Sequence, residues 1–165
     1  MKKEEKYQLL VKQVEALVEG EKDDIAIMAN VCAAIHDAMG FFWTGFYRVM
    51  TISHPGMSDG QSQELRLGPF QGPVACMHIP FGKGVCGSAW QQRKTLVVPD
   101  VEQFPGHIAC SSLSRSEIVV PVFTPDCRDV IAVLDIDSKQ LNTFDDTDRQ
   151  YLELICQIMA SAIYL

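Results

Sequence analysis

The sequence predicts an α+β domain, in which helices flank a central, mainly antiparallel sheet. Two amphipathic segments open the chain, short β-rich segments fill its middle, and a further amphipathic segment closes it. Helical and extended segments do not alternate one by one, as they do in a parallel α/β fold. The predicted order is two helices, three strands, a short helix, three strands and a last helix. The chain has 165 residues, the length of one domain, and we expect that domain to span residues 1–165.

Two helices are predicted before the first strand. Apolar residues at three-and-four spacing form one stripe in residues 4–19, and Gly20 follows as a C-terminal cap. The same spacing runs from about Asp24 to Met39, and Gly40 ends the pattern. The stripes consist of Tyr7, Leu10, Val11, Val14, Leu17 and Val18 in the first helix, and of Met28, Val31, Cys32, Ile35 and Met39 in the second.

The middle of the chain is predicted to be mostly extended. Residues 41–50 are rich in aromatic and β-branched side chains, which is typical of a strand. Glycine, proline, serine and aspartate dominate residues 53–63, so we expect an exposed hairpin loop there. The other expected elements are strands at 64–70, 73–79, 95–100, 117–123 and 129–136, a short helix near 85–92, an irregular segment at 100–115 and a helix from about Asp145 to Tyr164.

Composition and charge argue against several classes of function. The chain has 14 lysines and arginines against 21 aspartates and glutamates, and its net charge of −7 argues against a nucleic-acid binder. The apolar runs are too short to span a bilayer. The N-terminal MKKEEKYQLL does not have the apolar core of a signal peptide. We therefore expect a cytoplasmic protein with no membrane partner and no nucleic-acid partner.

Six cysteines are the first unusual feature of the chain. Cytosolic thiols are kept reduced, so we expect these cysteines to be buried apolar residues, metal ligands or redox groups. Cys32 and Cys156 lie on apolar helical stripes and are predicted to be small buried hydrophobes. Cys127 lies in the polar turn PDCRD and is predicted to be an incidental exposed thiol.

The other three cysteines, Cys76, Cys86 and Cys110, lie in the glycine- and proline-rich central third. A metal site could combine them with His78 and His107, although the chain has no CxxC pair and isolated histidines are more often structural or exposed. A redox site would need one thiolate nucleophile and a second thiol to attack its sulfenic acid. Spacing alone leaves the redox, metal and purely structural interpretations open.

Acidic residues end two predicted strands. Asp135 and Asp137 follow an apolar run, and Glu117 opens the run IVVPV. They are either strand-end acids turned to water or the floor of a pocket that binds an ammonium group or holds a proton for acid catalysis. Period-two alternation places Ile131, Val133, Asp135 and Asp137 on one face and Val130, Ala132, Leu134 and Ile136 on the other.

Two further features could belong to a pocket. Trp43, Gly45 and Tyr47 share one face of a predicted strand, where the aromatic rings form either core or a pocket wall that suits a methyl group or a sulfur atom. The segment FGKGVCG lacks the spacing of a phosphate loop. We expect its glycines to supply backbone freedom and N–H groups for an anion such as a carboxylate.

Several motifs, in one order along the chain, resemble the free methionine-(R)-sulfoxide reductases, a single-domain GAF family. They are WTGFY, LGPFQGPVAC, IPFGKGVCGSAW, VPDVEQFPGHIACSSLSRSEIVVPV and VLDIDS. The resemblance covers roughly residues 25–165. It implies a GAF fold with a small pocket, reduction of the free rather than the peptide-bound sulfoxide, no bound cofactor, and thioredoxin as electron donor. The loop at 53–63 and the turn TPDCRD look longer than is usual in this family.

The resemblance also implies a role for individual residues. Cys110 would be the nucleophile, Cys76 the resolving cysteine and Cys86 an accessory thiol, within catalytic loops at about 70–115. Cys110 would attack the sulfoxide sulfur while a carboxyl group protonates the oxygen, and Cys76 would then close a disulfide. The residues expected to bind the substrate are Trp43, at its methyl group, Tyr47, on the same strand face, and Glu117, Asp135 and Asp137, at its sulfoxide and amino groups, with Glu117 also catalytic.

Other outcomes remain open at this point. A homodimer is expected from the resemblance, and the N-terminal helix at about 4–19 could supply its interface. A GAF module that senses a small molecule without catalysis is the alternative function, although such modules usually regulate an attached output domain and we expect none here. A metal-binding or structural protein is the third interpretation, which stoichiometric zinc in the purified protein would favour.

Overall fold

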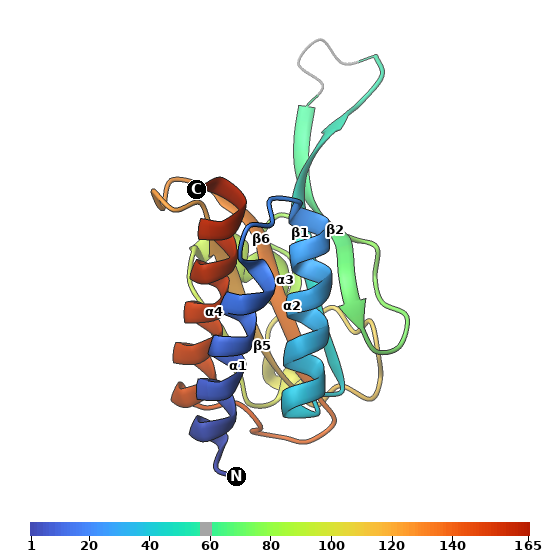
Figure 1. The fold of residues 1–165 in the computed structure, drawn as a ribbon. Coiled ribbons are helices and arrows are strands. Elements are labelled where there is room, and N and C mark those ends of the chain that lie inside the picture. Colours follow the sequence, from blue (N-terminus) through green and yellow to red (C-terminus); the bar gives the residue numbers. More distant parts are fainter. Residues whose placement is uncertain (57–60) are drawn as a thin grey trace.

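Six strands form one antiparallel sheet in the order β3-β2-β1-β6-β5-β4, and helices cover it (Figure 1). The computed structural model describes residues 1–56 and 61–165. The predicted α+β class and the predicted order of elements are confirmed. The helices are α1 (Lys3–Val18), α2 (Asp24–Met39), α3 (Gly84–Gln92) and α4 (Asp146–Tyr164), with a 3₁₀ turn η1 (Val101–Gln103); the strands are β1 (Trp43–Ser53), β2 (Gln61–Gln71), β3 (His78–Pro80), β4 (Leu96–Val98), β5 (Ser116–Phe123) and β6 (Val130–Ser138).

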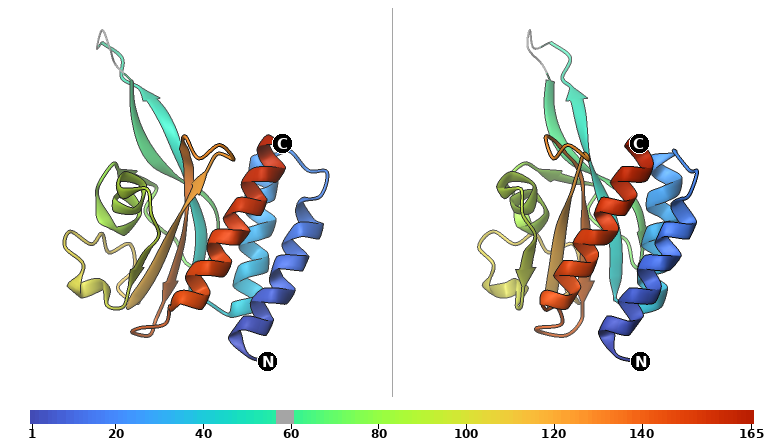
Figure 2. Two further views of the ribbon diagram at one scale, coloured as in Figure 1. Left: turned by 90° about the vertical axis from the view of Figure 1, so that its left-hand side faces the viewer. Right: turned by 60° about the vertical axis from the view of Figure 1, so that its left-hand side comes forward.

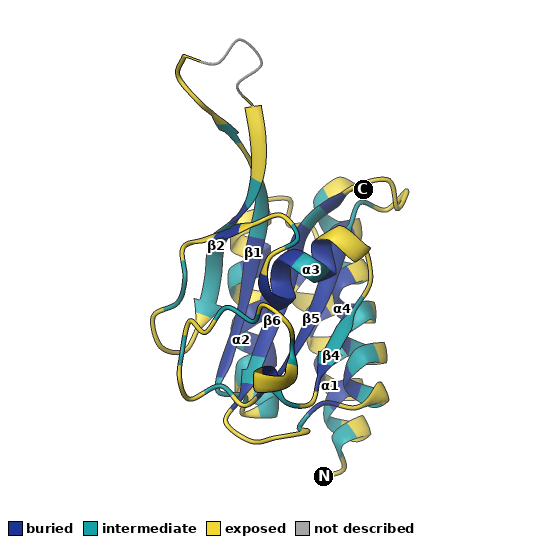
Figure 3. Cartoon of the chain, turned by 180° about the vertical axis from the view of Figure 1, so that it is seen from behind, coloured by how far each residue is buried: buried dark blue, intermediate teal, exposed yellow. Residues whose placement is uncertain are grey.

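The two faces of the sheet are covered differently. Helices α1, α2 and α4 lie side by side on one face, and α3 with the long loops lies on the other (Figure 2). The helical layer and the sheet share the larger hydrophobic core, which includes Phe46, Ile118 and Leu134. Seen from the α3 side, strands β1, β6 and β5 are buried in the middle of the sheet, while the far end of the β1–β2 hairpin is exposed (Figure 3). None of the described helices is both long enough and apolar enough to cross a bilayer.

Side chains at the helix ends explain where α2 and α4 begin and stop. The Asp23 carboxylate accepts a hydrogen bond from the Ala26 N–H and caps α2, and Gly40 ends this helix in the left-handed conformation, with φ 69°. Asp145 caps α4 by accepting from the Thr147 and Asp148 N–H groups. These boundaries agree with the sequence because the caps are local.

Most of the predicted stripe of α1 packs within the chain, but Leu17 is exposed. Its residues Tyr7, Leu10, Val14 and Val18 are buried in the larger core, between α2 and α4. The expected homodimer stays a prediction, and any contact through α1 would have to use the helix's outer, exposed side. Cys32 and Cys156 are buried as expected, and Cys127 is exposed.

The β1–β2 hairpin projects beyond the rest of the sheet (Figure 1). Strand β1 pairs with β6 only as far as Arg48, and from Val49 to Ser53 it pairs with β2 alone. The loop predicted at 53–63 includes residues of both strands, since β1 continues to Ser53 and β2 begins at Gln61. Its central residues, 57–60, lie outside the described residues.

The strand predicted at 73–79 is wrong, since only His78–Pro80 pairs with β2. Before it, the Met77 carbonyl still accepts a hydrogen bond from the Leu67 N–H of β2 at 3.0 Å, whereas two earlier carbonyl groups accept from side chains. The Pro73 carbonyl accepts a hydrogen bond from Trp43 Nε1 at 2.9 Å, and the Cys76 carbonyl accepts from the Tyr47 hydroxyl at 3.0 Å. The strand expected at 95–100 is likewise reduced to Leu96–Val98.

The alternation predicted for β6 holds from Ala132 to Asp137 and fails at its start. Val130 belongs to the core on the α3 side, and Ile131 packs against the larger core, the reverse of the prediction. The β5–β6 register shifts between Val122 and Phe123, opposite this point. Such an irregularity exchanges the faces of the residues beyond it.

Candidate active site

A pocket opens on the α3 side of the sheet, where β1, β6 and β5 lie next to one another. Asp137 is paired with Trp43 on one side and with Glu117 on the other, and Asp135 is paired with Gly45. Residues at paired positions point to the same face of a sheet. The strand register therefore gathers the aromatic and acidic residues in one pocket, which Trp43, Tyr47, Glu117, Asp135 and Asp137 all line.

Two of the three acids of this pocket are buried, and the third, Asp137, is half-buried. Glu117 is 5% exposed and Asp135 6%. Burial, and then the charge of Asp137, raise the pKa of Glu117 to about 8. Burial is also the main cause that raises the pKa of Asp135 and of Asp137 well above the usual range, followed by the charge of Glu117 and of Asp135 respectively. No lysine or arginine is found among the described residues that line the pocket. The cluster therefore retains protons at neutral pH.

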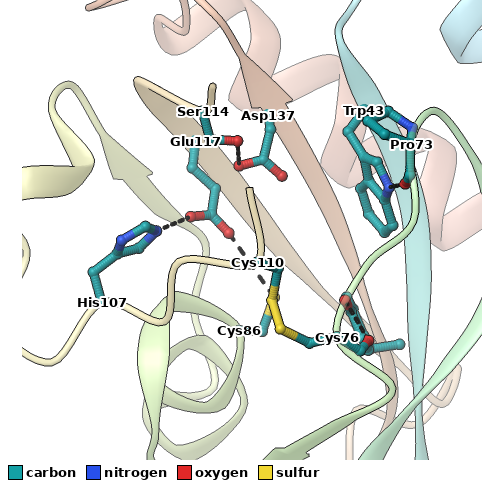
Figure 4. Close-up of a disulfide and its surroundings, with 10 residues drawn as sticks. Trp43, Pro73, Cys76, Cys86, His107, Cys110, Ser114, Glu117 and Asp137 are labelled. Carbon is teal, nitrogen blue, oxygen red and sulfur yellow. Dashed lines mark hydrogen bonds and ion pairs between the residues drawn. A yellow bond between two sulfur atoms is a disulfide. The ribbon is translucent and has the colours of Figure 1, made fainter. Parts of the chain in front are cut away.

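Two side chains from the irregular segment before β5 touch the acids (Figure 4). The Ser114 hydroxyl donates to Asp137 Oδ1 at 2.8 Å, and His107 Nε2 lies 3.7 Å from Glu117 Oε2. Burial lowers the pKa of His107, against an opposing effect of Asp135. The sequence left the role of His107 open and gave no reason to single out Ser114. The one feature of the local sequence that points to these two residues is that they flank Cys110 in the chain.

The three central cysteines meet at this pocket. Cys76 and Cys110 are joined by a disulfide with a Cα–Cα distance of 5.5 Å, and Cys86 lies beside them as a free, buried thiol (Figure 4). The Cys86 Sγ is 4.0 Å from Glu117 Oε1. Burial, and then the charge of Asp135, raise the pKa of Cys86 well above its usual value. Cys86 is therefore a protonated thiol at neutral pH.

Trp43 forms the wall opposite the acids. Its ring stacks against Phe70 at 5.4 Å and against Tyr47 at 5.9 Å between centroids. Glycine at position 45 leaves room for this ring, since a Cβ there would lie 2.3 Å from Trp43 Cη2. The hydrogen bonds to Pro73 and Cys76 then attach the loop that carries Cys76 to this wall. The aromatic wall and the disulfide are thus held together.

The first turn of α3 faces the same pocket. Gly84, Val85 and Cys86 line it, and the preceding Lys83 makes no side-chain cap. Across the described ranges, no acceptor is found for the N–H groups of these three residues, and the first N–H bonded within the helix is that of Gly87. A helix N-terminus of this kind attracts an anion. The carboxylate site expected in FGKGVCG would lie at these N–H groups and stays a prediction.

The metal ligands considered from the sequence do not all meet. His78 is exposed and bonds Glu64 Oε1 at 2.9 Å, and it does not line the pocket. A different trio, Cys86, Glu117 and Asp135, has ligand atoms within 4.8 Å of one another. Their raised pKa values mean that a metal ion would have to displace protons from these groups.

Comparison with known proteins identifies the architecture. The GAF domain family matches residues 22–163. GAF domain-containing protein A of Dictyostelium discoideum is 53% identical over 95% of this chain and 92% of its own length. The free methionine-R-sulfoxide reductase of Saccharomyces cerevisiae is 37% identical over 96% of this chain and 86% of its own.

A solved structure supports the same family relationship. The free methionine-R-sulfoxide reductase of Neisseria meningitidis, in complex with its substrate, superimposes with a TM-score of 0.88 and 46% identity, covering 99% of this chain and 91% of that one. The sheet, the helical layers and the pocket define a GAF domain. The chain belongs to the GAF domain family, in the group that contains the free methionine-R-sulfoxide reductases.

Proposed function

We propose that this protein reduces free methionine-(R)-sulfoxide to methionine, with Cys110 as the nucleophile. The observation that carries the proposal is the Cys76–Cys110 disulfide at a pocket with buried acids on one side and Trp43 on the other. The substrate complex of the Neisseria relative, 46% identical over 99% of this chain, supports the same choice of substrate.

The pocket offers a partner for each part of the free amino acid. The methyl group packs on the Trp43 ring, beside Tyr47, because an aromatic face suits a methyl group next to sulfur. The carboxylate binds the free N–H groups at the start of α3. The ammonium group pairs with a carboxylate of the cluster, such as Asp137, whose protonation Ser114 opposes. A peptide amide offers no such charge, so the free amino acid is selected.

The oxygen moves from the substrate to Cys110. In the reduced protein the Cys110 thiolate attacks the sulfoxide sulfur while the protonated Glu117 or a neighbouring acid gives its proton to the oxygen. Methionine leaves, and the oxygen stays on Cys110 as a sulfenic acid. The Cys76 thiol then attacks the Cys110 sulfur, and the hydroxyl leaves with a proton as water. The two thiols lose two electrons and the sulfoxide gains them.

An external thiol must then reduce the disulfide. Thioredoxin fits this role, because thiol–disulfide exchange transfers both electrons without a bound cofactor. Cys86 lies next to the pair as an accessory thiol. The reaction belongs in the cytoplasm, where such a reductase and reduced thiols are present.

The test is NADPH oxidation coupled through thioredoxin reductase and thioredoxin. Free methionine-(R)-sulfoxide, its S epimer and an N-blocked R-sulfoxide are compared, with Cys110→Ser as the inactive control. Turnover of the free R form alone, lost in Cys110→Ser, is expected. Binding of the sulfoxide without turnover, by folded and reduced protein, would contradict the proposal and favour a sensing module.

A further inference from the structure

The Cys76–Cys110 disulfide lies among exposed apolar side chains. Val74 is 87% exposed, Met77 68% and Leu113 55%. Consecutive Cα atoms are about 3.8 Å apart, so Val74 and Met77 lie within about 8 Å of Cys76, and Leu113 within about 11 Å of Cys110. The disulfide joins the two loops that carry them, with 5.5 Å between its Cα atoms. The three exposed side chains therefore belong to the two loop segments that the disulfide joins.

The two loops also carry no formal charge. Residues 72–82 and 104–114 contain no aspartate, glutamate, lysine or arginine, whereas the whole chain has 14 basic and 21 acidic residues. Such a surface costs little to desolvate, and depletion of charged residues is typical of the centre of protein interfaces. Exposed apolar side chains on neighbouring loop segments are typical of interaction sites.

We propose that Val74, Met77 and Leu113 form the docking surface for a protein reductase that presents its reduced dithiol within an apolar, uncharged surface. The proposal rests on the proposed function, because that reaction leaves one disulfide here in every turnover. Cys110 is exposed and Cys76 half-buried, so an incoming sulfur can reach the bond. A charged partner surface would lose its hydration here without gaining an ion pair.

The exchange that follows docking is balanced within the two proteins. One reductase thiolate forms a bond to one sulfur of the pair, the Cys76–Cys110 bond breaks, and the other cysteine leaves as a thiolate. The second reductase thiolate then attacks its own partner sulfur, closes the reductase disulfide and releases the remaining cysteine. Two electrons pass from the reductase to this protein, and both released thiolates take up protons.

The experiment measures reduction of the preformed disulfide directly, without sulfoxide. Oxidised wild-type protein, Met77→Gln and Leu113→Gln are each mixed with reduced thioredoxin, and separately with dithiothreitol, and the released thiols are followed in time. Leu9→Gln is the matched control, because Leu9 is 56% exposed on α1, on the opposite face of the sheet (Figure 2).

The second-order rate constant with thioredoxin is expected to fall about tenfold in each loop variant, as for side chains at the centre of an interface. The rate with dithiothreitol, and both rates for Leu9→Gln, are expected to stay as in the wild type. Unchanged thioredoxin rates in both loop variants would overturn the proposal, and so would equal losses with thioredoxin and dithiothreitol. Failure of the proposed function would show separately, as absence of sulfoxide reduction by wild-type protein supplied with dithiothreitol.

Discussion

Glu117 and Asp137 occupy paired positions on β5 and β6, and both side chains point into the pocket. Their Cβ atoms therefore lie about 4.5–5.5 Å apart. Trp43 is the partner of Asp137 on the other side. Glu117, Asp137 and Trp43 therefore lie in a row across the sheet. In the proposed reaction, Glu117 at one end protonates the sulfoxide oxygen, and Trp43 at the other end contacts the methyl group.

The raised pKa of Glu117 predicts how stability depends on pH. The native state holds this proton up to about pH 8, whereas an unfolded glutamate loses it near its ordinary value of 4.5. The native state therefore binds more protons between these values, and the free energy of unfolding falls as the pH rises through them. Glu117→Gln, which keeps a neutral side chain, should flatten this fall and add about 1–3 kcal/mol at pH 8. Urea unfolding at several pH values measures the free energy of unfolding of both proteins. If this free energy fell equally with pH in the wild type and in Glu117→Gln, the raised pKa of Glu117 would be contradicted.

The same substitution tests the proton donor. Gln cannot supply a proton to the sulfoxide oxygen, so kcat should fall about 10²- to 10⁴-fold in Glu117→Gln. In the wild type, kcat should decline above about pH 8, where Glu117 loses its proton. Steady-state rates from pH 6 to 9.5 check both statements. A variant that keeps more than half of the wild-type kcat would show that another acid donates the proton.

The Ser114 hydroxyl is expected to favour the ionised form of Asp137. Its hydroxyl donates to Asp137 Oδ1 and opposes the raised pKa of that carboxyl group. Ser114→Ala should leave Asp137 more often protonated and so weaken the ammonium site, with a rise in KM of about five- to tenfold and a smaller change in kcat. The KM deficit should shrink at high pH, as Asp137 ionises. Ser112→Ala, on the same exposed loop, serves as the control.

Gly45 is expected to be intolerant of any side chain. A Cβ at this position would lie 2.3 Å from the Trp43 ring, so Gly45→Ala has to displace the ring. The cost should be about 1–3 kcal/mol of stability, as for other overpacked sites, together with loss of substrate affinity. The chain has two tryptophans, so in a Trp90→Phe background the fluorescence of Trp43 reports its displacement. An unchanged emission spectrum and an unchanged KM would contradict the role of the Trp43 ring as a wall of the substrate site.

The two cysteine roles can be separated by single substitutions. Cys76→Ser should still form one methionine per chain and then stop with a sulfenic acid on Cys110, which a sulfenic-acid reagent captures. Cys110→Ser should form none. Cys127→Ser, an exposed thiol away from the pocket, should behave as the wild type. Multiple turnovers by Cys76→Ser with thioredoxin would contradict the resolving role of Cys76.

Features that depend on local sequence were predictable. Amphipathic spacing and caps placed the helices, and alternation placed Asp135 and Asp137 together on one face of β6. Trp43 and Tyr47 share their face for the same reason. These patterns are properties of a single helix or strand, so they hold wherever no irregularity, such as the one at the start of β6, interrupts the element.

Features that depend on tertiary contacts were not predictable from the sequence. The segment at 73–77 was predicted to be part of a strand, but its Pro73 and Cys76 carbonyl groups accept hydrogen bonds from the side chains of Trp43 and Tyr47. Cys76 and Cys110 stand 34 residues apart in irregular loops, so only the family resemblance suggested that they pair. Ser114 reaches the acids through the path of a loop, for which the sequence holds no periodic signal.

The most direct test of the central claim is a single turnover without any external reductant. Fully reduced protein is mixed with an excess of free methionine-(R)-sulfoxide, and methionine, free thiols and cross-linked peptides are quantified. The account predicts one methionine and the loss of two thiols per chain, with Cys76 and Cys110 in one disulfide-linked peptide. Methionine formed while both cysteines remain free thiols, or no methionine formed at all, would contradict it.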